Sequence, residues 1–135
     1  MLGYAGAYVS NLSKHRDVIL IVEDDFLIRM NATDMVRQMG LDVLEAADAD
    51  EAVKLLESVP EITVVFTDIQ MPGSMDGLRL AEVIRHRWPP VLLLITSGQL
   101  SPAADDIPPG ARFIAKPYFS AQLHDQLEML AGGRA

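Results

Sequence analysis

Two short aliphatic runs constrain the fold of this chain more than any other feature. Val18–Val22 and Val91–Ile95 each hold five apolar residues bounded by polar or turn residues. Runs of this length without polar alternation are typical of strands that are buried on both faces. They are far shorter than the roughly 20 apolar residues of a membrane-spanning helix, so we expect no membrane association. The sequence therefore predicts strands at the centre of a covered sheet.

Weaker strand patterns and helical patterns alternate with these two runs. Three further segments favour strands, namely 41–46, 62–67 and 112–115. Apolar residues at helical spacing lie between and after the strands, within 28–39, 52–59, 80–88 and 119–130. Such alternation predicts an α/β fold, with a doubly wound parallel sheet covered by helices on both faces. The connection 99–110 contains three prolines, which predicts a short or irregular fourth helix.

Length and composition fit one globular domain. The chain has 135 residues, half of them apolar, which is enough for a single core. We expect an N-terminal extension at 1–16, the domain at 17–131, and a frayed glycine-containing tail at 132–135. The sequence given shows no output domain after residue 131, so we expect the domain to act through another protein or through an attached chain outside this sequence.

Charge and cysteine usage exclude several classes of function. The net charge of −8 disfavours direct binding to nucleic acid, whose phosphates carry the same sign. The chain has no cysteine, which excludes thiolate metal sites and a cysteine nucleophile and fits a reducing compartment. The first residues lack the basic and apolar regions of a secretory signal. We therefore expect a cytoplasmic protein.

Polar residues collect where the predicted strands end. The first strand is followed by the acids 23–25, the third by Asp68, the fourth by Thr96, and the fifth by Lys116. Ligands of open parallel sheets bind beyond these carboxyl ends. Two carboxylates about 5 Å apart repel by roughly 3 kcal/mol at an effective dielectric near 20, so one is protonated or a cation lies among them. Oxygen donors favour Mg²⁺ before Ca²⁺, and Mg²⁺ often bridges to phosphate.

Five segments in this order resemble the receiver domain of two-component response regulators, from about residue 17 to residue 130. They are Ile19–Asp24, Thr67–Pro72, Met75–Gly77, Thr96–Gly98 and Phe113–Pro117. The resemblance implies a flavodoxin-like (βα)5 fold with strand order 2-1-3-4-5. It also implies a phosphorelay protein that takes a phosphoryl group from a histidine kinase onto an aspartate and then switches a protein-binding surface. Such a domain catalyses only its own phosphorylation and dephosphorylation.

The resemblance assigns roles at the acceptor. Asp68 corresponds to the phospho-acceptor, Thr96 to the hydroxyl that donates to the phosphoryl group, and Lys116 to the ammonium that pairs with both. The implied Mg²⁺ ligands are Glu23, Asp24, Asp68 and the main-chain carbonyl of Gln70.

The same resemblance implies a switch and a backbone geometry. Phe113 occupies the position of an aromatic side chain that turns when the acceptor is phosphorylated, coupled to Thr96 and to the 99–110 connection. The Lys116–Pro117 peptide bond is expected to be cis. The segment between Pro72 and Asp76 has one residue more than the usual pattern, so its loop is expected to be reshaped.

Several alternatives remain open at this stage. Asp24 or Asp25 is expected to cap the following helix, and no other role is assigned to Asp25. A degenerate receiver that binds partners without phosphorylation is one alternative function. A flavodoxin-like enzyme is another, although the acids 23–25 would repel the phosphate of a flavin. The phosphodonor is a sensor histidine kinase or a phosphotransfer protein, the downstream partner is unknown, and homodimerisation is open.

Overall fold

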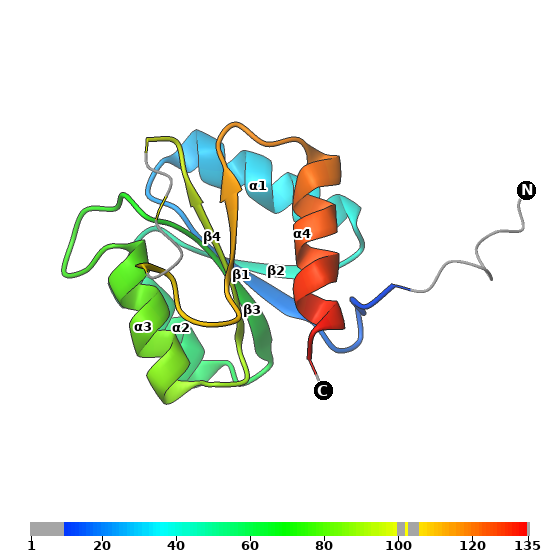
Figure 1. The fold of residues 1–135 in the computed structure, drawn as a ribbon, viewed down its shortest axis with the longest axis horizontal. Coiled ribbons are helices and arrows are strands. Elements are labelled where there is room, and N and C mark those ends of the chain that lie inside the picture. Colours follow the sequence, from blue (N-terminus) through cyan, green and yellow to red (C-terminus); the bar gives the residue numbers. More distant parts are fainter. Residues whose placement is uncertain (1–9, 100–101, 103–105, 135) are drawn as a thin grey trace, which may run out of the picture.

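The computed structural model describes residues 10–99, 102 and 106–134, and Figure 1 shows its strands and helices. Within these residues, a helix follows each of the five strands except the fourth, after which the sequence predicts a short or irregular helix. The elements are β1 (Val18–Val22), α1 (Phe26–Gln38), β2 (Asp42–Ala46), α2 (Ala49–Ser58), β3 (Ile62–Asp68), α3 (Gly77–Arg87), β4 (Leu92–Ser97), β5 (Arg112–Ala115) and α4 (Ser120–Gly132).

The sheet is parallel throughout, with the strand order β2-β1-β3-β4-β5. The predicted fold class and strand order are therefore confirmed. Helices α1 and α4 cover one face of the sheet, and α2 and α3 cover the other (Figure 1). Strand β4 continues two residues beyond the predicted end at Ile95, and this places Thr96 inside the sheet.

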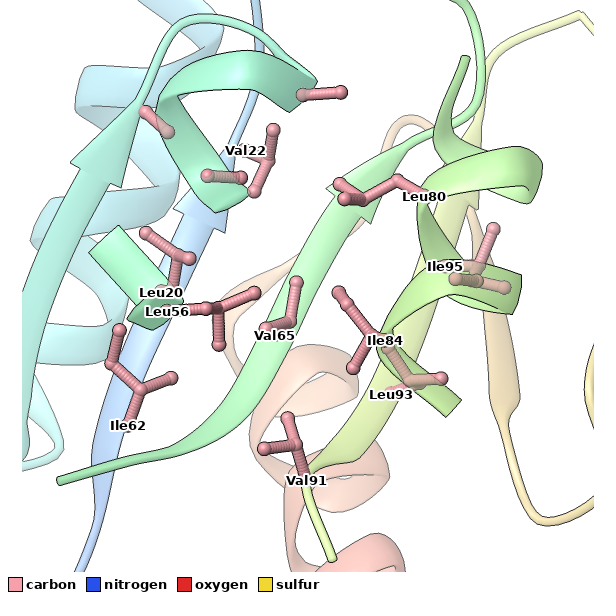
Figure 2. Close-up of a cluster of buried hydrophobic side chains, with 14 of the residues drawn as sticks. Leu20, Val22, Leu56, Ile62, Val65, Leu80, Ile84, Val91, Leu93 and Ile95 are labelled. Atoms are coloured by element: carbon pink, nitrogen blue, oxygen red, sulfur yellow. The ribbon is translucent and has the colours of Figure 1, made fainter. Parts of the chain in front are cut away.

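Two apolar clusters fill the space between the sheet and its helices. Leu20, Val65 and Leu93 project from three neighbouring strands toward α2 and α3, where they meet Leu56 and Ile84 (Figure 2). The cluster on the opposite face joins the side chains that alternate with these along the strands to α1 and α4; they include Ile19, Ile21, Val64, Phe66 and Leu94. The aliphatic runs are thus buried on both faces, as their composition predicts.

An aspartate begins each of the first three helices. Asp25, Asp48 and Asp76 accept hydrogen bonds from the main-chain N–H groups of the residues three positions later. Each carboxylate satisfies a donor that the first turn leaves unpaired. Asp25 is therefore the cap of α1, and Asp48 is the cap of α2.

The connection from β4 to β5 carries no α-helix in the residues that can be described there, which are 98–99, 102 and 106–111. This agrees with the predicted irregular connection, and the rest of that segment, 100–101 and 103–105, lies outside the described residues. The label α4 consequently belongs to the C-terminal helix, which packs beside β4 and β5 (Figure 1).

Both ends of the described chain make specific contacts with the domain. Leu12 is buried in the cluster beneath α4, and the N–H of Asn11 donates to Glu128 at 2.8 Å. Gly132 still belongs to α4, and Arg134 binds the Asp17 carboxylate through both terminal nitrogens. The expectations of a frayed tail and of an extension outside the core are therefore wrong for 132–134 and 10–16. Residues 1–9 and 135 lie outside the described residues.

Candidate functional site

The strand register brings the predicted site residues to one edge of the sheet. Asp68 pairs with Thr96 across β3 and β4, and Val22 pairs with Thr67 across β1 and β3. Glu23 follows Val22 directly, and Lys116 follows the end of β5. Glu23, Asp68 and Thr96 are buried, and Lys116 is partly buried.

The Lys116 ammonium lies between two carboxylates. Its Nζ is 2.7 Å from Glu23 Oε1 and 3.2 Å from Asp68 Oδ2. Burial opposes its charge, but the Glu23 hydrogen bond and the Asp68 charge together raise the pKa of Lys116. For Glu23, burial raises the pKa, and the neighbouring Asp68 charge raises it further. The hydrogen bonds from Lys116 and Asp25 lower it but do not outweigh this rise. Lys116 is therefore a fixed positive charge at the site.

Three carboxylates converge beside this lysine. One oxygen each from Glu23, Asp24 and Asp68 lie within 4.8 Å of one another. At that separation each pair of charges repels by about 3 kcal/mol at an effective dielectric near 20, and one ammonium cannot offset three carboxylates. An all-oxygen set with one exposed member suits a hard divalent cation that keeps several waters, so the residues fit Mg²⁺.

Gln70, the fourth predicted ligand, lies just beyond Asp68 in the loop after β3. Its side-chain Oε1 accepts a 2.8 Å hydrogen bond from Ser97 Oγ. This bond ties the acceptor loop to the end of β4. The predicted role of the Gln70 main-chain carbonyl stays a prediction.

Two buried oxygens at this edge have no hydrogen-bond partner among the described residues. They are Asp68 Oδ1 and Thr96 Oγ1, which belong to residues paired in register on neighbouring strands. Leaving a buried polar atom unpaired costs about 1–3 kcal/mol, so such atoms commonly mark a site completed by a ligand. The unpaired carboxylate oxygen and the unpaired hydroxyl therefore point to a bound group that receives their interactions.

Arg29 supports the site from α1, a role that the sequence analysis missed. Its Nη1 donates to the main-chain carbonyl of Glu23 at 2.7 Å, and its Nε donates to Glu45 at 3.1 Å. The N–H of Asp25 in turn donates to Glu23 Oε2 at 3.1 Å. These contacts fix the turn that presents Glu23 and Asp24. The sequence does hold a signal for this role, because Arg29 lies one turn into the helix that directly follows the acids 23–25.

Gly77 packs directly against the backbone of the acceptor. A Cβ at this position would lie 1.8 Å from the Asp68 carbonyl oxygen, closer than any real contact. The Gly77 N–H also donates to the Ile69 carbonyl at 2.9 Å. Helix α3 therefore approaches Asp68 as closely as it does because residue 77 has no side chain.

The loop between β3 and α3 contains the extra residue noted in the sequence. Gly73 adopts a φ of +108°, a conformation that other residues avoid. Ser74 Oγ donates to Asp50 in α2 at 2.6 Å. The loop is thus anchored to α2 at its outer end.

The predicted switch residues lie on opposite faces of the sheet. Phe113 pairs with Ile95 and packs in the cluster with α2 and α3, whereas Thr96 pairs with Ile114, whose side chain is in the cluster with α1 and α4. Tyr118, which the sequence analysis did not select, lines a small cavity with Thr96 and Asp68. Burial and then the charges of Glu23 and Asp68 raise the pKa of its phenol. The Lys116–Pro117 peptide bond is cis, the geometry that the resemblance implied.

Comparison with known proteins places these features in a family. The sequence profile of the response regulator receiver domain matches residues 19–128. A putative NtrX-like response regulator of Rickettsia bellii is 35% identical over 109 residues, which cover 78% of this chain and 23% of that protein. The transcriptional regulatory protein PdtaR of Mycobacterium tuberculosis is 32% identical, over 82% of this chain and 55% of its own length. This chain therefore spans about a quarter to a half of these relatives.

Solved structures agree with the sequence comparison. The receiver domain of NtrX from Brucella abortus superposes with a TM-score of 0.78 at 30% identity, covering 85% of this chain and 98% of that one. A response regulator receiver protein from Sinorhizobium medicae gives a TM-score of 0.80 at 26% identity, covering 91% of this chain and all of that one. With the family profile, the fold and the acidic strand-end site in agreement, this chain belongs to the response regulator receiver domains of two-component signalling systems.

Proposed function

We propose that the chain accepts a phosphoryl group on Asp68 from a sensor histidine kinase or a phosphotransfer protein, and that Mg²⁺ assists. One observation supports this proposal most strongly. Asp68 Oδ1 and Thr96 Oγ1 are buried, adjacent in register and without partners among the described residues, beside the Lys116 ammonium. A phosphoryl group on Asp68 would give the Thr96 hydroxyl an acceptor and Lys116 a second anion.

The Mg²⁺ would be held by Glu23, Asp24 and Asp68, together with the Gln70 carbonyl. The three carboxylates already place one oxygen each within 4.8 Å of one another. Bound there, the ion would offset the charge that accumulates when a phosphate approaches three carboxylates. Glu23 is buried and held by Lys116, whereas Asp24 is exposed, so Asp24 is the ligand whose loss disturbs the fold least.

The transfer itself requires Asp68 as a carboxylate. One of its oxygens forms a bond to phosphorus while the P–N bond of the donor phosphohistidine breaks, and the bonding electrons stay with the imidazole nitrogen. No proton leaves Asp68, because it reacts in the ionised form. The Lys116 ammonium, 3.2 Å from Asp68 Oδ2, remains in place to pair with the phosphoryl oxygens. The protein acts on its own side chain and is not proposed to turn over a separate substrate.

An apolar surface beside the acceptor supports docking of the donor protein. Phe26 and Leu27, in the first turn of α1, are 61% and 66% exposed. A cavity of about 280 Å³ joins Leu27 to Lys116 and Tyr118. Exposed apolar groups next to a charged site are typical of protein-binding surfaces.

Thr96 and Phe113 remain the proposed route from the acceptor to an output surface. Since their side chains project to opposite faces, the signal would pass through the paired backbones of β4 and β5 and not through direct contact. The connection 99–110 contains three prolines, which have no main-chain N–H to donate, and the Ala111 N–H donates to the Pro108 carbonyl at 3.1 Å. Because prolines remove main-chain donors, we propose that this segment changes arrangement at small energetic cost.

Phosphorylation by acetyl phosphate tests the assignment of the acceptor. With Mg²⁺ present, the wild type should gain the mass of one phosphoryl group, and Asp68→Asn should gain none. Asp42→Asn changes an exposed carboxylate at the start of β2 and should label like the wild type. Equal labelling of Asp68→Asn would place the acceptor elsewhere, and an unlabelled wild type would favour the phosphorylation-independent binding module.

Thermal denaturation with and without Mg²⁺ tests the ligand set. A ligand that binds only the folded state stabilises it, by about 2.7 kcal/mol at a concentration of 100 Kd. We expect Mg²⁺ to raise the melting temperature of the wild type and Asp24→Ala to lose most of that rise. Asp34→Ala, which removes an exposed acid on α1, should keep it. An undiminished rise in Asp24→Ala would show that the ligand set is wrong.

A further inference from the structure

A second cavity opens at the edge of the sheet opposite the acceptor, where β3 and β4 begin. Its volume is about 620 Å³, within the 300–1,000 Å³ that is usual for small-molecule sites. Ile62 and Val91, which lie at the lower end of the cluster in Figure 2, and Leu56 contribute apolar wall. Trp88 and the Pro89–Pro90 turn complete this apolar side. The cavity has no residue in common with the acceptor site.

The polar side of the cavity is cationic in an acidic protein. The chain has 11 Lys and Arg residues against 19 acids, yet three arginines line this one cavity and Glu57 is its sole lining carboxylate among the described residues. The three are Arg16, Arg87 and Arg134. Asp17 pairs with Arg134 and Glu57 pairs with Arg87, so the three guanidinium groups leave one net positive charge at this wall of an acidic protein.

Arg16 and Arg87 each donate one hydrogen bond to the part of the chain that the structure describes. Each guanidinium carries five N–H donors. Arg16 donates from Nη2 to the Asn11 carbonyl at 2.7 Å, and its Nε lies 3.8 Å from Asp17. Arg87 donates from Nη2 to Glu57 at 2.8 Å. The remaining donors of these two residues are available to an anion that enters the cavity.

Arg87 and Trp88 form a stacked pair at the cavity wall. The guanidinium carbon lies 4.3 Å from the centroid of the indole ring. Such stacking fixes both groups and places an aromatic surface beside a positive charge. An aromatic ring that carries an anionic substituent matches both features, since the ring packs on the apolar wall and the anion faces the guanidinium groups.

We propose that this cavity binds a small aromatic carboxylate. An inorganic anion would leave the apolar wall of Leu56, Ile62 and Val91 without contacts, and a neutral hydrocarbon would bury arginine donors without an acceptor. A monocarboxylate with one or two rings satisfies both sides and fits the volume. The site is independent of phosphorylation at Asp68, so failure of either proposal leaves the other intact.

Binding of 2-naphthoate to the full chain tests the proposal. Isothermal titration calorimetry should show one site, with an affinity at least ten-fold higher than for 2-naphthamide, the neutral compound of nearly the same shape. Trp88 is the only tryptophan, so its single indole N–H signal in a heteronuclear NMR spectrum reports on the cavity. That signal should shift in proportion to occupancy.

Matched arginine variants locate the anion. Arg16→Gln should weaken naphthoate binding at least five-fold and leave naphthamide binding unchanged, because the Arg16 side chain is 58% exposed and its loss should not disturb the fold. Arg79→Gln is the control, since Arg79 is an exposed arginine of α3 outside the cavity.

Four binding results would each overturn the proposal: no saturable binding, equal affinity for acid and amide, unchanged affinity in Arg16→Gln, or displacement of naphthoate by inorganic phosphate at similar concentrations. An indole signal that shifts with protein concentration alone would show instead that a second copy of the chain covers the cavity, and this would also overturn it.

Discussion

Removing the Arg134 side chain should destabilise the protein, although Arg134 is the second-last residue. Arg134 binds Asp17, whose side chain is 0% exposed. The same carboxylate accepts from the Ser13 N–H and from Thr63 Oγ1, each at 2.8 Å. The two Arg134 contacts with it measure 2.6 and 2.9 Å. The C-terminal arginine thereby ties the end of α4 to the start of β1.

The magnitude follows from the pKa of Asp17. Burial by itself would raise this pKa, but the hydrogen bonds from Arg134, Ser13 and Thr63 outweigh it and lower the pKa from 3.8 to about 2. A shift of this size corresponds to about 2 kcal/mol of stability near neutral pH. Because the folded-state pKa is the lower one, this contribution is fully present above pH 4 and disappears as the pH falls toward 2.

Urea denaturation of Arg134→Ala measures the contribution. At pH 7 the variant should lose about 2 kcal/mol of its unfolding free energy, because the buried carboxylate then keeps hydrogen bonds only from the neutral Ser13 N–H and Thr63 hydroxyl. Between pH 4 and pH 2 its stability should fall less than that of the wild type, since the ion pair is already absent. Adding Asp17→Asn to the variant should recover part of the loss.

A neighbouring arginine supplies the control for this experiment. Arg16 lies 3.8 Å from the same carboxylate but is 58% exposed, so Arg16→Ala should cost less than about 0.5 kcal/mol. If Arg134→Ala also stays within about 0.5 kcal/mol of the wild type at pH 7, the reasoning about this ion pair is refuted.

Two further predictions concern the acceptor edge. Gly77→Ala should lower the unfolding free energy by about 1–3 kcal/mol and slow labelling by acetyl phosphate, because its Cβ would lie 1.8 Å from the Asp68 carbonyl oxygen. Gly98→Ala is the control: its Cβ would lie at an ordinary 3.7 Å from Lys116 carbons, so it should lower stability and labelling less. Amide hydrogen exchange should change most between residues 96 and 113 on phosphorylation, and a change confined to 70–76 would show that the output surface lies elsewhere.

The fold was predictable because it rests on periodicity and on helix caps, which are local. Val18–Val22 alone indicates a doubly covered strand, and Asp76 before an apolar stripe indicates where α3 begins. The strand ends then place Glu23, Asp68 and Lys116 at one edge without any knowledge of packing. For the same reason, the acidic site was accessible from the sequence.

Other features depend on contacts between distant segments and had no local signal. Arg134 follows two glycines, a composition that suggests fraying, and only the position of Asp17 beneath it shows otherwise. Gly77 is an ordinary residue until α3 is placed against Asp68. Phe113 and Thr96 were coupled by resemblance, whereas the register that puts them on opposite faces emerges only from the pairing of β4 with β5. Local patterns specify elements, and tertiary packing specifies which side chains meet.

The position of Lys116 connects the geometry of the site to its proposed chemistry. Its shorter contact is with Glu23 at 2.7 Å, and its longer one is with Asp68 Oδ2 at 3.2 Å. Asp68 therefore keeps its other oxygen, Oδ1, without a hydrogen bond from the described residues. Phosphorylation would replace the single negative charge of the Asp68 carboxylate with a phosphoryl group that carries about −1.5 to −2, at the side of the lysine where the contact is weaker. The attraction should draw Lys116 toward residue 68 and weaken its hold on Glu23. Because Lys116 ends β5 and Glu23 begins the turn into α1, this single movement would alter two neighbouring segments of the acceptor edge.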